Sequence, residues 1–153
     1  MSALNAARSF AAAASLGGLV VITACASPDA DASAYRQSSV AALQATLSET
    51  RTAELAARLW LDGSSTLAVA RVLVHGNDKG VASEQSWFAA LQPPGRAGDH
   101  VRSHTLDAID TAGSAVSETR IALSRADRGA TVTAVHHLAQ AGAELEALTE
   151  GAP

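Results

Sequence analysis

Histidine is the residue type in this sequence with the most evident capacity for chemistry. The five histidines lie in three places: His75, the pair His100 and His104, and the adjacent His136 and His137. A spacing of four residues places His100 and His104 on one face of a helix, where two imidazoles can bind one transition-metal ion. Two ligands make a weak site, because tight sites use three or four ligands whose imidazoles are oriented by hydrogen bonds.

His75 and His137 are the one pair of histidines from distant segments that could converge. In an antiparallel bundle of four helices, His75 and His137 stand at about the same height. Their helices are diagonal in the simplest bundle, so the two side chains would have to meet through its centre. His100 and His104 lie opposite the apolar stripe of their own segment, and we expect them to be solvated. We therefore expect no tight metal site and retain metal binding or sensing in the cell envelope as the alternative function.

The sequence lacks the residue patterns of common catalytic sites. It contains no Glu-x-x-His pair of the di-iron bundle type and no Gly-x-Ser-x-Gly turn, and its single methionine and single cysteine are Met1 and Cys25. Thioether copper sites, thiol catalysis and cysteine-ligated zinc sites therefore lack their residues. We expect a protein that is not an enzyme and has no cofactor. An enzyme with an unusual polar site around Glu84 is the least favoured option.

Charge argues against nucleic acid as a partner. The formal net charge of the chain is −4, and loss of Arg8 with a leader would make it one unit more negative. The charges are spread along the chain, whereas nucleic-acid binding needs a clustered basic face.

The first 25 residues have the order of a bacterial export signal. Arg8 supplies a positive charge and is followed by an apolar run from Phe10 to Ala24. As a helix this run would reach only ~22 Å, short of the ~30 Å hydrocarbon core of a bilayer. The run ends in Ile22-Thr23-Ala24-Cys25, which resembles the lipobox of bacterial lipoproteins.

This resemblance covers only the leader, and it implies how the chain is processed and where it is located. The Cys25 thiol would receive a diacylglyceryl group, and a lipoprotein signal peptidase would remove residues 1–24. Two acyl chains would then hold the protein in the lipid bilayer, on the extracytoplasmic face of the cell membrane. Residues 25–33 would form a lipidated tether. The alternatives are an ordinary secretory signal or a cysteine buried in the fold.

The remaining residues, 34–150, predict one all-α domain of four helices. Turn chemistry divides them at Gly63-Ser64, at Gln92-Pro93-Pro94-Gly95 and at Asp127-Arg128-Gly129. No segment alternates as a strand would. Four amphipathic segments with short connections predict an antiparallel up-and-down four-helix bundle.

The second segment has the clearest periodicity. A heptad spacing runs through Leu67, Val74, Val81 and Phe88 and keeps its phase across residues 76–80. We therefore predict one helix through this glycine-containing stretch, although each glycine costs about 1 kcal/mol in a helix. Asn77 and Glu84 share the companion positions of the heptad, and we expect both to be solvated. Burial, fixing helix register or binding a partner, is the alternative.

The other segments carry apolar stripes of their own. In the third and fourth segments the stripes keep to one face; their members are Leu106, Ile109, Val116 and Leu123, then Val135, Leu138, Gly142, Leu145 and Leu148. In the first segment the stripe of Val40, Leu43 and Leu47 gives way to Leu55, Leu59 and Leu61 at another angle. A bend near Thr50 would explain that change.

In general pattern the mature part resembles small helical lipoproteins of unassigned function from actinobacteria. This resemblance brings no site residues with it. The expected function is a non-enzymatic binding or interaction module of the cell envelope, which presents a surface to an unknown envelope protein partner.

Overall fold

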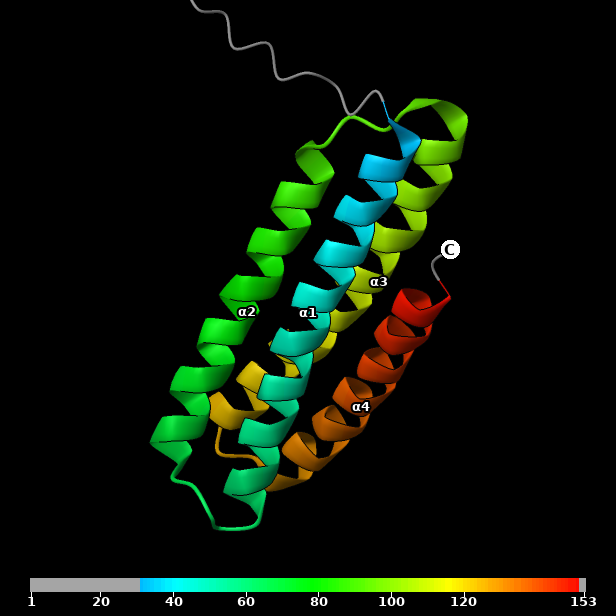
Figure 1. Cartoon of the computed structure of the whole chain (residues 1–153). Coiled ribbons are helices and arrows are strands. Elements are labelled where there is room, and N and C mark those ends of the chain that lie inside the picture. The colour runs from blue at the N-terminus through cyan, green and yellow to red at the C-terminus, as the bar shows by residue number, and fades with distance from the viewer. Residues whose placement is uncertain (1–30, 152–153) are drawn as a thin grey trace, which may run out of the picture.

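The computed structural model describes residues 31–151, and this part of the chain is an up-and-down bundle of four helices. The helices are α1 (Ala32–Leu61), α2 (Leu67–Ala90), α3 (Gly95–Ser124) and α4 (Arg128–Glu150). Consecutive helices run in opposite directions and lie side by side (Figure 1). The sequence-based prediction of an all-α four-helix bundle is confirmed. The leader and Cys25 lie outside the described residues.

Short polar side chains fix where three of the helices begin. The Asp31 carboxylate accepts a hydrogen bond from the Ser33 N–H at 2.8 Å, and Asp127 does the same for Ala130 at 2.9 Å. Thr66 caps α2 through the Val69 N–H. These caps satisfy backbone donors that a helix leaves free in its first turn. The first helix thus begins at Ala32, two residues before the start predicted from the sequence.

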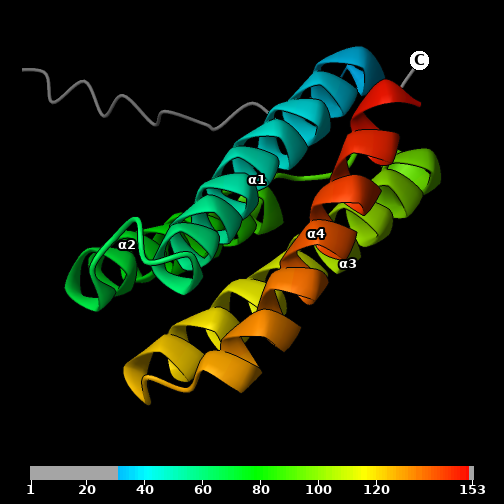
Figure 2. The ribbon, with the colours of Figure 1, turned by 90° about the horizontal axis from the view of Figure 1, so that it is seen from below.

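The four helices do not form a square in cross-section. Helices α1 and α3 contact each other directly through the middle of the bundle, whereas α2 and α4 make no contact. Figure 2, a view from below, shows the helices in that arrangement. Residues of these two parallel helices therefore meet directly at the centre of the bundle.

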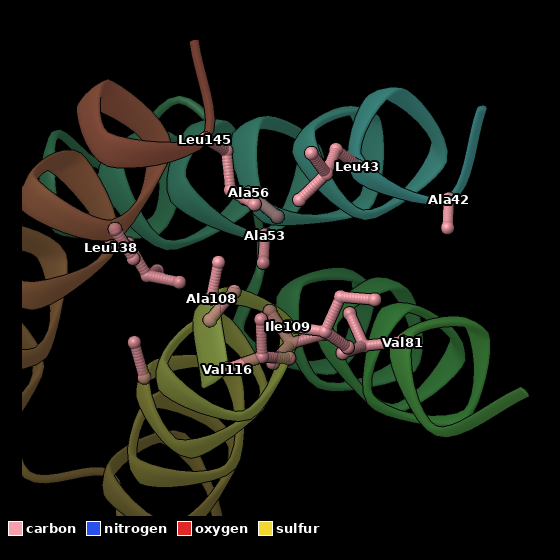
Figure 3. Close-up of a cluster of buried hydrophobic side chains, with 14 of the residues drawn as sticks. Ala42, Leu43, Ala53, Ala56, Val81, Ala108, Ile109, Val116, Leu138 and Leu145 are labelled. Carbon is pink, nitrogen blue, oxygen red and sulfur yellow. The ribbon is translucent and has the colours of Figure 1, made fainter. Parts of the chain in front are cut away.

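Small and branched apolar side chains from all four helices fill the core (Figure 3). Leu138 and Leu145 enter it from α4, Ile109 from α3 and Val81 from α2, and each is almost completely buried. Many of the remaining core residues are alanines, mainly on α1 and α3. Within the described residues, the core extends from Tyr35 to Leu148 and takes its members from all four helices.

Helix α2 continues without interruption through residues 76–80, as its periodicity predicted. Val74, Val81 and Phe88 are buried at the predicted spacing. The expectation that Asn77 is solvated is wrong, because Asn77 is 7% exposed and occupies the core position that the heptad gives it. Glu84 is half-buried.

The expected shift of the apolar face along α1 does not occur. Leu55 and Leu59 are exposed, and the core face instead continues through smaller side chains. Its buried members after Leu43 include Thr46, Thr50, Ala53, Ala57 and Trp60. These residues recur at intervals of three or four, so a single helical face is buried from end to end and no bend is needed.

Thr46 offers a test of this polar core. Its hydroxyl is buried and has no hydrogen-bond partner within the described part of the chain. We expect Thr46→Val to raise the free energy of unfolding by about 1 kcal/mol, because a buried hydroxyl without a partner is costly and valine has a similar shape. Urea denaturation followed by circular dichroism measures this change.

Thr50→Val is the matched control. The Thr50 hydroxyl donates to the Thr46 carbonyl oxygen at 2.8 Å, so its removal brings no comparable gain. Equal effects of the two substitutions would contradict the interpretation.

Candidate functional site

The structure separates the histidines that the sequence offered as weak metal ligands. His75 lies on α2 and His137 on α4, and these helices do not contact each other, so the two side chains do not meet. The His137 Nδ1 atom instead lies 2.7 Å from a Glu118 carboxylate oxygen on α3, and both side chains are exposed. His100 and His104 are exposed, as predicted.

Within residues 31–151, no three side chains of the His, Cys, Asp or Glu types are grouped so that they could hold a metal ion. The predicted lipidation residue, Cys25, precedes the described residues.

A groove lies between the first halves of α1 and α3 and the end of α4. Its volume is about 710 Å³, within the range of small-molecule sites. The groove exists because α4 has 23 residues whereas α1 and α3 have 30 each. At 1.5 Å per residue α4 is about 10 Å shorter, so it leaves the upper ends of α1 and α3 uncovered. Figure 1 shows α4 ending below the start of α1.

The groove continues the face of α1 on which α4 packs. Ser33, Gln37, Val40 and Gln44 line the groove at intervals of three or four residues. Seven residues after Gln44, on the same face, Arg51 contacts Glu146 of α4 at 2.8 Å. Side chains that would otherwise lie beneath a fourth helix are therefore open to solvent.

The two ends of the groove differ in chemistry. Leu148 of α4 lines the groove together with the apolar Val40 and Leu43 of α1. The floor holds a buried pair of hydroxyls, Ser39 Oγ and Thr105 Oγ1, which are 2.7 Å apart and share a hydrogen bond. This contact also fixes the register of α1 against α3.

The other end of the groove carries its basic side chains. Arg36 lies one turn before Ser39, and His100 and His104 lie just before Thr105 on a helix that runs in the same direction. All three line the groove, and no aspartate or glutamate is among its lining residues. On a chain of net charge −4, this end is a local concentration of basic groups.

No model of a known protein family matches this chain. No curated protein and no solved structure matches it either. The groove's own residues must therefore indicate what it does.

The largest cluster of charged side chains joins α1 to α4 and has a structural role. Arg51 contacts Glu54 within α1 and Glu146 on α4, and Arg58 also contacts Glu54. The hydrogen bonds that Arg51 donates to Glu146 and Glu54 raise the pKa of Arg51. Gly142 allows the approach, since a Cβ there would lie 2.8 Å from the Arg51 Cζ atom. The cluster fixes the α1–α4 contact below the groove.

The sequence identified His100 and His104 as candidate ligands, but it did not indicate that they border a groove. The interpretation as a solvated pair is correct for exposure, yet both side chains border a groove with Arg36. One signal was present in the sequence: the breakers already made the fourth segment shorter than the first and third. The direct α1–α3 contact, which gives the groove its floor, had no such signal.

Proposed function

We propose that the protein is a lipid-anchored binding module of the cell envelope and that its groove is the binding site. One observation carries this proposal: the groove opens at the end of the bundle where α1 begins, and α1 follows the segment that contains Cys25. Asp31 is the sixth residue after Cys25, so six residue steps separate the two. Even fully extended, they span only ~20 Å. A lipidated Cys25 would therefore hold the groove close to the bilayer surface.

The lining of the groove suits binding better than catalysis. It combines apolar side chains with basic groups and with two hydroxyls, of Ser39 and Thr105, that are hydrogen-bonded to each other. Sites for small ligands have this composition, with many apolar contacts and few oriented polar groups. A tether and an open groove support a role in capturing or presenting a ligand at the membrane.

Cys25→Ser tests the anchor. We expect it to abolish incorporation of a fatty-acid probe into the protein in growing bacteria and to leave the precursor uncut, because the thiol is the acceptor of the lipid. Labelling followed by gel electrophoresis of the membrane fraction measures both effects. Within residues 31–151, no helix is long and apolar enough to span a bilayer.

Ser27→Ala, two residues beyond the predicted cleavage site, is the control and should be labelled like the unchanged protein. Equal labelling of Cys25→Ser and Ser27→Ala would refute the anchor.

A further inference from the structure

We propose that the groove binds a single-chain anionic amphiphile of the fatty-acid class. The carboxylate lies among Arg36, His100 and His104, and the acyl chain runs along α1 toward Leu148. This inference deepens the proposed function, since it rests on the groove being a binding site and adds the chemistry of the ligand.

The length of the groove matches one acyl chain. On α1 it extends from Ser33 to Gln44, which at 1.5 Å per residue is about 16 Å. One lipid chain spans half of the ~30 Å hydrocarbon core of a bilayer, or about 15 Å. About 10 Å of this length lies between Arg36 and Leu43, so a chain whose carboxylate lies at Arg36 would pass over Leu43 and Leu148 before its methyl end.

The charges give the ligand its direction. Arg36 is a permanent cation at the end of the groove where α1 begins, and the two histidines face the same end from α3. No acidic residue lines the groove, although the charge of Arg36 also acts on the Asp31 carboxylate just before α1. Val40, Leu43 and Leu148 at the other end, next to Gln44, present apolar surface that methylene groups can cover.

The form of the groove favours one chain over two. It runs lengthwise along the first half of α1, and residues of α3 form the opposite wall. A free fatty acid fills such a groove lengthwise, whereas a two-chain phospholipid would leave one chain in water. We therefore assign the site to a free fatty acid and not to a lipid that remains in the bilayer.

Palmitate binding tests the assignment. The probe is palmitate below its aggregation limit, titrated by calorimetry into the chain from residue 26 onward, which contains the complete bundle and lacks Cys25. We expect saturable binding of one palmitate per chain and at least about tenfold weaker binding of the neutral hexadecanol, because a charge-assisted contact is lost.

Two substitutions, each with a matched control, locate the ligand. Val40→Glu places a carboxylate against the acyl chain and should weaken palmitate binding by at least about tenfold, since burying an unpaired charge is costly. Val132→Glu makes the same change at an exposed site on α4, outside the groove, and should leave binding unchanged. Arg36→Glu should weaken binding several-fold, whereas Arg96→Glu, exposed and outside the groove lining, should not.

Several results would overturn the assignment. They are no saturable binding of palmitate, equal affinities of Val40→Glu and Val132→Glu with both variants folded by circular dichroism, or binding only to vesicles of phosphatidylglycerol. Failure of Cys25 labelling with palmitate binding intact would remove the anchor alone. Normal labelling without palmitate binding would remove this assignment alone.

Discussion

Phe88→Ala is expected to lower the free energy of unfolding by about 3–5 kcal/mol, a large share of the stability of a small domain. Phe88 is completely buried, and its ring lies 5.5 Å from that of Tyr35 on α1. Many of the other core residues are alanines, whose side chains are too short to extend into the space that the ring leaves. Urea denaturation followed by far-ultraviolet circular dichroism measures the loss.

Trp87→Ala is the control for this substitution. Trp87 is the preceding residue on the same helix, but its side chain is 46% exposed. We expect its truncation to cost less than about 1 kcal/mol, in line with other surface positions. Similar costs for Phe88→Ala and Trp87→Ala would show that the α1–α2 contact is packed more loosely than described.

Gly98→Ala is expected to lower the free energy of unfolding by about 1–3 kcal/mol, although alanine is the better helix former. An added Cβ at Gly98 would lie 2.5 Å from Pro94 Cδ and 3.0 Å from Pro93 Cβ. Proline rings cannot swing aside, so the turn before α3 would have to move. Thermal or urea unfolding of the variant provides the measurement.

Gly76→Ala is the control, because it adds the same methyl group at a helical site where no proline ring is in the way. Gly76 is exposed within α2, and an added Cβ there would meet nothing within 4 Å. We expect it to raise the free energy of unfolding by about 0.5–1 kcal/mol, because alanine loses less conformational freedom in a helix. Shifts of the same sign in both variants would rule out a steric role for Gly98.

Periodicity and breakers were sufficient to predict the helices. The heptad spacing of Val74, Val81 and Phe88 outweighed the poor helix propensity of residues 76–80, and α2 is continuous. Tertiary burial of one face stabilises a helix more than local propensity does, so phase was the better guide. The same reasoning should have placed Asn77 in the core, since it shares that phase.

Helix α1 shows where hydrophobicity misleads. Leucine is the stronger apolar signal, but Leu55 and Leu59 are exposed, and Ala53 and Ala57 are buried. Close approach of helices requires small side chains, and a buried threonine can satisfy its hydroxyl within its own helix, as Thr50 does. Neither effect is visible in a hydrophobicity pattern.

The candidate site depends on relations between helices. The groove needs a fourth helix that is shorter than α1 and α3, and it also needs α1 and α3 in direct contact. Sequence periodicity indicates which face of each helix is buried. It does not indicate which pair of diagonal helices is in direct contact. Lipidation at Cys25 is a separate inference from the leader and stays a prediction.

The separation of α2 from α4 has a consequence for how the energies of substitutions combine. Each of these helices contacts only α1 and α3. Substitutions at distant sites without shared partners add nearly independently. Sequence changes on α2 and α4 can therefore accumulate with little epistasis between them, whereas each remains coupled to its neighbours on α1 and α3. Substitutions on α1 and α3, in contrast, are coupled directly through the contact of these two helices.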